Sequence, residues 1–366
     1  MREILRYLTS GESHGPALIA ILEGLPANVP VDLDKINNEM KRRQTGYGRG
    51  GRMKIETDTV KILSGIRFGK TMGSPVSMLI KNNDFINWQE KMMQFGTPEN
   101  EVPPITTPRP GHADFAGMKK YKTNDLRNIL ERSSARETAM RVAVGAICKQ
   151  FLELYNIKIF SHTLSIKDIK ANTAKLDYDE IAQNAENNDL RCADLSVLDG
   201  MRTLIDEAKE DGDTLGGISE VIALNVPVGL GSFMHYDRKI DGLIAQNLMS
   251  VQSVKAVEFG AGFAGTLKSG ADFHDQIYAS GRKTNNAGGI EGGMTNGEPI
   301  VVRAAVKPIP TLKKPLNTID ILTNEETSAH SERSDVCVVP AAGVVLEAAL
   351  AFTLANAILA DFNDAV

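Results

Sequence analysis

The residues of this chain best suited to chemistry are two histidines that lie in glycine turns. His14 lies in the segment GESHG at residues 11–15, and His112 lies in RPGHAD at residues 109–114. A histidine titrates near neutral pH, so a turn that displays one is a natural place for proton transfer. His162, His235, His274 and His330 lack such a setting. We therefore expect His14 and His112 to act as acids or bases.

Arginines accompany these two histidines along the chain. The planar guanidinium group binds carboxylate or phosphate through two parallel hydrogen bonds. Together with the histidines, they suggest a polyanionic substrate that is processed by proton transfer. The arginines concerned are Arg42, Arg43, Arg49, Arg52, Arg109, Arg132, Arg136 and Arg333.

The segment RSSARETAMR at residues 132–141 begins cationic and runs into an apolar stretch. Ser134 followed by Glu137 is a capping box, which predicts a helix N-terminus at Ser134. The unpaired N–H groups there, with Arg132 and Arg136 beside them, favour an anion site. The alternative is a capped surface helix with solvated arginines.

A second cationic segment, KRRQTGYGRGGR at residues 41–52, holds five basic residues and no acidic one on a glycine-rich backbone. We expect an anion to order this loop. The glycine-rich stretch at residues 285–297 is suited to close approach by a planar ligand, and a plain flexible loop is its alternative.

Composition restricts the function classes. The 366 residues are 42% hydrophobic and 24% charged, with a formal net charge of −5. These are ordinary values for a globular protein, and no global positive field would attract nucleic acid or anionic lipid. The N-terminal residues lack the apolar region of a signal peptide.

The three cysteines also limit the class of protein. Cys148, Cys192 and Cys337 are widely spaced, without a C-x-x-C pair. This pattern supports neither a disulfide framework nor a zinc site, and it favours a reducing, cytoplasmic location without a structural metal.

Periodicity and turn residues predict alternating strands and helices. We expect strands at residues 5–9, 17–22, 53–66, 75–80, 158–166, 219–226, 254–259 and 300–306. We expect helices from Asp32 or Asp34, from Ser134, and at residues 179–188, 202–210, 240–249 and 340–360. The last is long enough to span a membrane, but Glu347 and Asn356 interrupt it, which favours a buried core or subunit-interface helix. The sequence of residues 82–110 predicts a long irregular excursion, that is, a surface segment without regular secondary structure.

Three familiar enzyme classes are not supported. A dinucleotide-binding enzyme is not supported, because the segment GAGFAG at residues 260–265 matches the fingerprint but is followed by a poor helix start. A serine hydrolase is not supported, because Ser13 next to His14 suggests a nucleophile but no orienting carboxylate is identifiable. An ATPase is not supported, because the chain has no phosphate-binding G-x-x-x-x-G-K-[ST] motif.

Taken in order, these segments resemble the chorismate synthase family. The resemblance rests on GESHG running on to EGLP at residues 23–26, on RSSARETA at residues 132–139, and on RSD at residues 333–335 with Glu347 beyond. RPGHAD and NAGGI at residues 286–290 are also family-like. The match spans almost the whole chain, so we expect one domain over residues 1–366.

The resemblance implies a carbon–oxygen lyase that depends on reduced FMN. Such an enzyme performs a 1,4-anti elimination of phosphate from 5-enolpyruvylshikimate 3-phosphate and gives chorismate without net redox change. The implied fold is α+β, a β-α-β sandwich with helices between antiparallel sheets and long loops over the site, in a homotetramer. Whether NADPH reduces the bound flavin or reduced flavin is borrowed stays open.

The resemblance also assigns roles by position. It implies catalytic roles for His14, His112 and Asp335. Flavin contacts are implied for Arg132, Ser133, Ser134, Gln252, Ser253, Gly292, Lys307, Pro308, Ile309, Pro310, Thr311 and Arg333. Contacts to substrate or NADPH are implied for Ser13, Arg43, Arg49, Arg52, Arg109 and Arg136.

Two alternatives come from other classes. A flavin oxidoreductase that acts on an anionic substrate would share the flavin site but would consume reductant at each turnover. An RNA-binding module would share the basic loop, but aromatic residues are only 5% of the chain and the net charge is negative.

Overall fold

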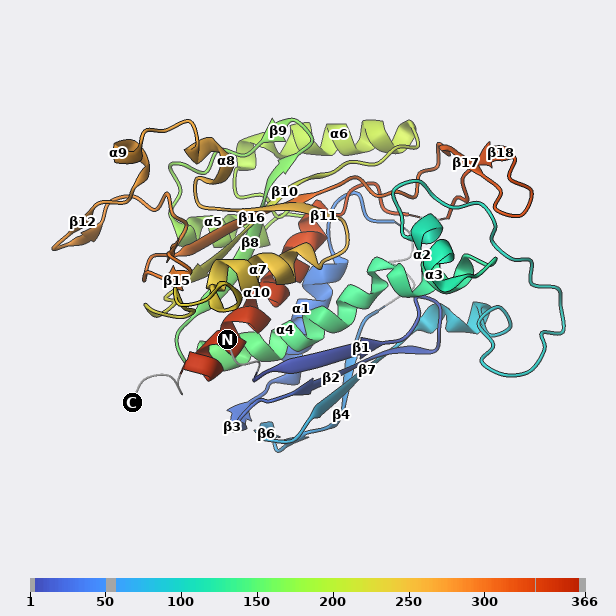
Figure 1. The fold of residues 1–366 in the computed structure, drawn as a ribbon, viewed down its shortest axis with the longest axis horizontal. Coiled ribbons are helices and arrows are strands. Elements are labelled where there is room, and N and C mark those ends of the chain that lie inside the picture. The colour runs from blue at the N-terminus through green and yellow to red at the C-terminus, as the bar shows by residue number, and fades with distance from the viewer. Residues whose placement is uncertain (1–3, 51–56, 333, 362–366) are drawn as a thin grey trace.

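The computed structural model describes residues 4–50, 57–332 and 334–361, and it places a layer of helices between two antiparallel sheets. Figure 1 shows α1 (Leu33–Gln44), α4 (Thr138–Glu153) and α10 (Val339–Asp361) in this middle layer, with α7 (Ile240–Met249) beside α10. The α+β class and the sandwich expected from the sequence are confirmed.

One sheet has four strands in the order β1 (Arg6–Ser10), β2 (Ala17–Glu23), β7 (Val76–Lys81), β4 (Val60–Ser64). Side chains alternate along β2, so that Leu18 and Leu22 are buried while Ile19 and Ile21 face outward. The buried face packs on the same apolar core as α1 and α4.

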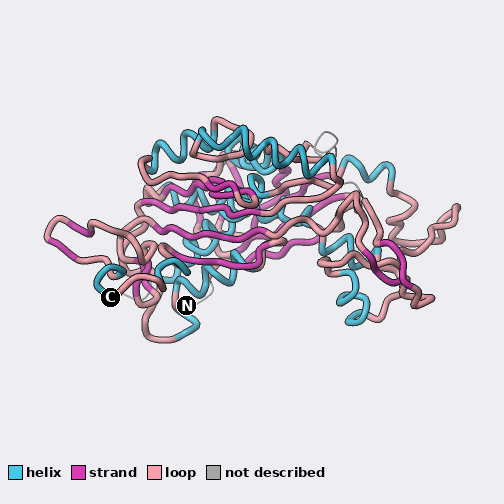
Figure 2. Tube along the Cα trace, turned by 90° about the horizontal axis from the view of Figure 1, so that it is seen from above, coloured by secondary structure: helices cyan, strands magenta, loops and turns pink. Residues whose placement is uncertain are grey.

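The other sheet has five strands in the order β11 (Val254–Phe259), β16 (Ile300–Val306), β10 (Gly217–Leu224), β8 (Lys158–Ile166), β9 (Ile169–Lys170). Figure 2 shows these strands running side by side. On the outer face, Ile181 of α5 (Tyr178–Glu186) joins Phe160 and Ile222 of the sheet in one apolar cluster. Met201 and Ile205 of α6 (Leu198–Glu210) form a second cluster with the ends of β8 and β16.

Helix α10 is apolar on all sides because protein surrounds it on all sides. By length and composition it is the one helix among the described residues that could cross a membrane, but most of its side chains are buried within the protein. Small residues allow close packing at its contact with α4. A Cβ added at Gly145 of α4 would lie 2.3 Å from the Cβ of Ala348. The prediction of a buried core helix is therefore confirmed.

Shorter elements complete the chain. The small strands are β3 (Ala27–Pro30), β5 (Ile66–Arg67), β6 (Lys70–Met72), β12 (Ile277–Tyr278), β13 (Gly281–Arg282), β14 (Ile290–Glu291), β15 (Met294–Thr295), β17 (Asn317–Ile319) and β18 (Glu326–Ser328). The short helices are η2 (Asn83–Asn87), α2 (Asp114–Tyr121), α3 (Arg127–Ser133), η3 (Ala135–Glu137), η4 (Leu195–Val197), η5 (Tyr236–Arg238), α8 (Gly262–Gly265) and α9 (Gly270–Phe273).

The helix predicted to begin at Ser134 begins later. Ser134 ends α3 and caps the 3₁₀ turn η3, where its side chain accepts from the backbone N–H of Arg136 at 3.3 Å, and α4 starts at Thr138. The capping box does not form, because the Glu137 carboxylate is bonded to Thr9 and Arg141 instead.

The long strand predicted at residues 53–66 is also wrong in its described part. Gly65, at φ +82°, separates β4 from β5, and residues 53–56 lie outside the described residues.

Candidate functional site

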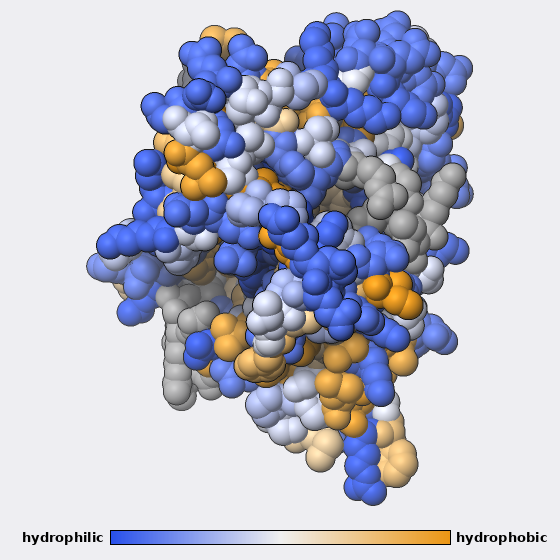
Figure 3. Space-filling model, turned by 90° about the vertical axis from the view of Figure 1, so that its right-hand side faces the viewer, coloured by the Kyte–Doolittle hydropathy of each residue, from blue (hydrophilic) through white to orange (hydrophobic). Residues whose placement is uncertain are grey.

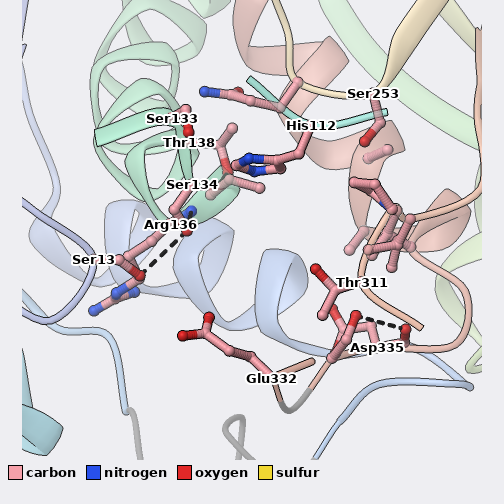
Figure 4. A pocket seen from close by; sticks show the side chains of 18 of the residues that line it. Ser13, His112, Ser133, Ser134, Arg136, Thr138, Ser253, Thr311, Glu332 and Asp335 are labelled. Atoms are coloured by element: carbon pink, nitrogen blue, oxygen red, sulfur yellow. Dashed lines mark hydrogen bonds between the residues drawn. The ribbon is translucent and has the colours of Figure 1, made fainter. Parts of the chain in front are cut away.

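A cavity of about 380 Å³ lies where the turn after β1, the end of α1, the segment from α3 to α4 and the start of α10 converge. The apolar part of its lining, called the apolar wall below, consists of Leu130, Val251, Val338, Ala342 and Val345. The polar side chains labelled in Figure 4 surround a common space. The face of the molecule that carries α2 and α3 is predominantly hydrophilic (Figure 3). Apolar lining together with a few convergent polar groups is typical of a small-molecule site.

The turn after β1 brings Ser13 and His14 to the cavity. His14 Nδ1 lies 2.8 Å from the carboxylate of Glu131, which is fully buried. A carboxylate can only accept, so the Nδ1 proton is donated to it. Ser134 Oγ donates to Ser13 Oγ at 3.2 Å, which joins this turn to the end of α3. An oriented imidazole ring and two hydroxyl groups are therefore part of the cavity lining.

His112 is held in a similar way by the segment that precedes α2. Its Nδ1 donates to Asp114, and Arg109 Nε donates to the same carboxylate at 2.9 Å. Arg109 Nη1 reaches Thr311 Oγ1 at 2.9 Å. Burial would raise the pKa of Asp114, but the hydrogen bonds from His112 and Arg109 outweigh it and hold that pKa well below its usual range. Asp114 is therefore an ionised anchor at neutral pH.

A cluster of guanidinium groups lies deep in the site. Arg43 donates to Thr138 Oγ1 at 3.0 Å and to the carbonyl of Ala135 at 3.1 Å. Arg136 donates to the Asp58 carboxylate at 2.7 Å. Burial lowers the pKa of Arg43 to about 9; Asp58 opposes this shift and the charge of Arg136 adds to it. The pair carries more positive charge than Asp58 neutralises, so an anion in the cavity would be stabilised here.

Asp335 is held by Arg49 and Gly50, which follow the end of α1. Its carboxylate lies 2.8 Å from Arg49 Nη1 and accepts from the backbone N–H of Gly50 at 2.5 Å. The residues after α1 and the segment before α10 thus meet at the cavity.

The lining of the cavity is completed by Gln252, Ser253, Lys307, Ile309, Pro310 and Thr311. Gln252 donates to Glu137 at 3.2 Å, and its Oε1 is buried without a hydrogen-bond partner among the residues that the structure describes. Lys307 donates to the carbonyl of Gly111. Burial, with the nearby charge of Lys255, lowers the pKa of Lys307.

Comparison with known proteins decides the family. The sequence model of the family described as chorismate synthase matches residues 5–359. A chorismate synthase from Aquifex aeolicus (strain VF5) is 56% identical over 371 residues, covering 97% of this chain and 92% of its own. One from Staphylococcus aureus is 51% identical over 368 residues, covering 98% of this chain and 95% of its own. A solved structure described as a crystal structure of chorismate synthase has a TM-score of 0.78 and 44% identity, covering 98% of this chain and 93% of that one.

The chain belongs to the chorismate synthase family. It is therefore a carbon–oxygen lyase, as the sequence predicted, and the oxidoreductase alternative is not favoured.

Most residues that the chorismate synthase resemblance assigns to the site lie together at this cavity. Their contacts with ligands stay predictions. The assigned residues that line the cavity are Ser13, His14, Arg43, Arg49, Arg109, His112, Ser133, Ser134, Arg136, Gln252, Ser253, Lys307, Ile309, Pro310, Thr311 and Asp335.

Three assigned residues are not among those that line the cavity. Arg132 is exposed, and its guanidinium group donates to the carbonyl and the hydroxyl of Thr9 at 2.8 and 2.9 Å. Pro308 lies against Gly216, where an added Cβ would be 2.9 Å from the proline Cδ. Gly292 forms the turn between β14 and β15, on the side of Figure 1 opposite α2 and α3. Arg52 and Arg333 lie outside the described residues.

The structure adds acidic residues to which the sequence analysis gave no role. Glu332 lines the cavity and lies 3.1 Å from Arg127. Asp58 holds Arg136, while Glu131 and Asp114 hold the two histidines. Only the contact of Asp114 with its histidine could have been inferred from the local sequence, because Asp114 lies two residues after His112 in RPGHAD. Among the described residues, no group of three or more His, Cys, Asp or Glu side chains could hold a metal ion.

Proposed function

We propose that this protein eliminates phosphate from 5-enolpyruvylshikimate 3-phosphate by a 1,4-anti mechanism, with reduced FMN bound in the cavity, and forms chorismate. The observation that carries the proposal is the cavity itself. Two histidines, each held at Nδ1 by a buried carboxylate, face the same space as the guanidinium groups of Arg43 and Arg136. Proton donors beside fixed cations suit the departure of an anionic leaving group.

The residues present fit a flavin. The apolar wall suits a planar ring system, and the buried Gln252 Oε1 is an acceptor that a ring N–H would satisfy. Ser133, Ser134 and Thr311 would supply further hydrogen bonds, and Lys307 would supply positive charge. When bound, reduced FMN supplies electron density to the breaking carbon–oxygen bond and a base for the proton that leaves C6.

The chain's own residues would bind and orient the anionic substrate. Arg43, Arg49 and Arg136 present guanidinium groups to the cavity, where a phosphate or carboxylate would meet several charged donors. These donors are held in place before substrate binds, so they stabilise the negative charge that develops on phosphate without reorganisation. His14 and His112 would each present an oriented imidazole ring to the bound ligands for proton transfer. Asp335, held by Arg49 and Gly50, would assist proton removal.

The direct test is an anaerobic assay. Purified protein, FMN reduced with dithionite and 5-enolpyruvylshikimate 3-phosphate should give chorismate, followed by its ultraviolet absorbance. Oxidised FMN alone should give none. Tight flavin binding without any chorismate would overturn the proposal.

A second arm of the assay concerns the source of reduced flavin. We infer that the protein takes reduced flavin from outside rather than reducing it with NADPH. The dinucleotide-like segment at residues 260–265 forms only the short helix α8, without the strand–helix–strand unit that binds dinucleotides. Oxidised FMN with NADPH should therefore give no chorismate, and turnover in that mixture would contradict the inference.

The assembly and location follow as further proposals. We infer a cytoplasmic protein, which is supported by the three buried, unpaired cysteines. We infer one domain over residues 1–366, since a single apolar core includes side chains from both sheets and the helix layer. A homotetramer is supported by the apolar side chains that the outer face of the four-stranded sheet exposes, including Leu8 and Ile21.

A further inference from the structure

The imidazole ring of His14 is held on two sides by residues that do not line the cavity. Glu131, whose side chain is fully buried, accepts from Nδ1 at 2.8 Å and from the His14 backbone N–H at 2.7 Å. The ring of Trp88 stacks on the imidazole, with centroids 3.9 Å apart and planes inclined by 24°. One contact fixes the edge of the ring and the other fixes its plane.

Both holding groups are themselves anchored. Trp88 Nε1 donates to Asp84 at 3.3 Å. Arg127 lies with its guanidinium carbon 5.0 Å from the centre of the Trp88 ring and its Nη1 3.3 Å from Glu131. Arg127 also pairs with Glu332 at 3.1 Å, which connects the group to the cavity wall. Because the imidazole ring of His14 is hydrogen-bonded at its edge and stacked on its face, few other rotamers are open to it.

We propose that Glu131 and Trp88 are positioning residues for His14. Glu131 keeps the proton on Nδ1, and Trp88 keeps the ring in the plane that turns Nε2 away from the carboxylate. Within the described part of the chain, Nε2 has no hydrogen-bond partner, so it is available to a ligand. This inference rests on the catalytic role of His14 in the proposed function.

The charge around His14 comes from several elements. Glu131 and Arg127 belong to α3, and Glu332 lies on the segment before α10. Asp84 and Lys91 lie in the excursion near Trp88, with Lys91 Nζ 5.2 Å from its ring. The further charged groups that line the cavity are Arg43, Arg49, Arg109, His112, Arg136, Lys307 and Asp335. Glu131 is the carboxylate in direct contact, so its removal should have the largest effect on protonation of His14.

The kinetic test uses Glu131→Gln, which keeps the size of the side chain and removes its charge. We expect kcat to fall about 10- to 100-fold, while KM and the dissociation constant of FMN change less than about twofold. The matched control is Glu220→Gln. Glu220 is buried in a similar group, 3.0 Å from His162 and 2.6 Å from Arg303, but the histidine that it contacts does not line the catalytic cavity. Its kcat should stay within about twofold of the unmodified protein.

The second variant pair tests the stacked ring. Trp88→Phe keeps an aromatic face against His14, whereas Trp88→Ala removes it. We expect Trp88→Phe to retain most of kcat and Trp88→Ala to lose about tenfold or more. Equal activity of the two variants would remove Trp88 from the proposal.

A spectroscopic test works without flavin or substrate. Trp88 is the only tryptophan in the chain and is stacked on His14. Indole emission depends on the ring stacked against it, so it reports the His14–Trp88 contact. We expect His14→Asn to change the emission of the unmodified protein, Glu131→Gln to change it in the same direction, and Glu220→Gln to leave it unchanged.

The two readouts separate the outcomes. If the unmodified protein makes no chorismate, the proposed function fails, while the emission of the variants still tests whether Glu131 positions His14. If Glu131→Gln keeps both the emission and kcat of the unmodified protein, Glu131 only tethers the turn and the inference is wrong.

Discussion

At the scale of single residues, the two cavity histidines share one design. Each donates through Nδ1 to a buried carboxylate, and an arginine binds the same carboxylate: Arg127 for Glu131 and Arg109 for Asp114. The arginine limits how strongly the carboxylate can hold the imidazolium proton, because it competes for the same negative charge. Both rings are thereby oriented at the wall of the cavity.

Replacing His112 should therefore damage chemistry rather than binding. We expect His112→Ala to lose about 10²- to 10⁴-fold in kcat, because a positioned acid or base contributes that range. Its dissociation constant for FMN, measured by flavin fluorescence, should change little. Unchanged turnover would remove His112 from the mechanism.

Arg49 should act on substrate binding. We expect Arg49→Ala to raise KM for the phosphorylated substrate about tenfold or more, since a charge-assisted hydrogen bond contributes about 1.5–3 kcal/mol. Initial rates over a range of substrate concentrations measure this. A KM equal to that of the unmodified protein would mean that the loop at residues 41–52 does not contact substrate.

At the scale of elements, the close contact between α4 and α10 sets the middle layer. We expect Gly145→Ala to lower the free energy of unfolding by about 1–3 kcal/mol, because the new methyl group would overlap the Cβ and Cα of Ala348. Gly242→Ala in α7 is the matched control, because an added Cβ there meets no atom within 4 Å. It should raise the free energy of unfolding by about 0.4–1 kcal/mol. Thermal or urea denaturation of both variants measures the difference, and equal stability would contradict the packing.

The elements also show how far sequence can predict this structure. Periodic segments such as β8 and α7 were predicted at their observed bounds. Strand β8 is buried along most of its length, and α7 buries one face at regular four-residue spacing, so the sequence of each carries a clear hydrophobic pattern. Ser134 misled because its partners lie elsewhere: Ser13 contacts its hydroxyl, and Thr9 and Arg141 bind Glu137. Arg141 is a local partner, but no local pattern indicates that Ser13 and Thr9, which are 121 and 128 residues from Ser134 and Glu137 respectively, will help to displace a capping box.

The same limit applies to the site. His14, His112 and the arginines could be found because their residue types and glycine turns are visible in the sequence, and most of the residues that the family resemblance assigned line one cavity. Glu131 could not be paired with His14, because 117 residues separate them and only the fold brings them together. Trp88 was visible as the only tryptophan, but its stacking on His14 depends on the path of the irregular excursion.

At the scale of the whole molecule, a buried ionic group ties the middle layer together. Glu347 of α10 is fully buried and lies 2.8 Å from Arg42 of α1, 2.5 Å from Lys149 of α4 and 3.1 Å from Arg191. Burial would raise the pKa of Glu347, but the charges of Arg42, Lys149 and Arg191 outweigh it and lower that pKa. Glu347→Gln would leave these cations without their shared partner, so we expect a loss of about 3–5 kcal/mol in the free energy of unfolding at pH 7. A loss below about 1 kcal/mol in urea denaturation would contradict this.

The same physics predicts how stability depends on pH. Burial would raise the pKa of Glu332, but its bonds to His330 and Arg127 lower it to about 2, and Asp114 and Glu347 are shifted in the same direction. A carboxyl group with a lowered pKa in the folded state stabilises the fold above its unfolded pKa of about 4 and loses that effect as pH falls. We expect Tm to be nearly constant from about pH 7 to 5 and to fall steeply between about pH 4 and 2. A Tm that stays constant to pH 2 in scanning calorimetry would contradict it.

The measurement that tests the central claim most directly is the number of product molecules formed per reduced flavin. A lyase needs its flavin reduced but does not consume it, whereas an oxidoreductase spends one reduced flavin per turnover. Anaerobic protein with a limiting, known amount of dithionite-reduced FMN and excess 5-enolpyruvylshikimate 3-phosphate should release many equivalents of phosphate and chorismate in equal amounts, and the flavin should remain reduced. One product or fewer per flavin, with oxidised FMN accumulating, would contradict the account.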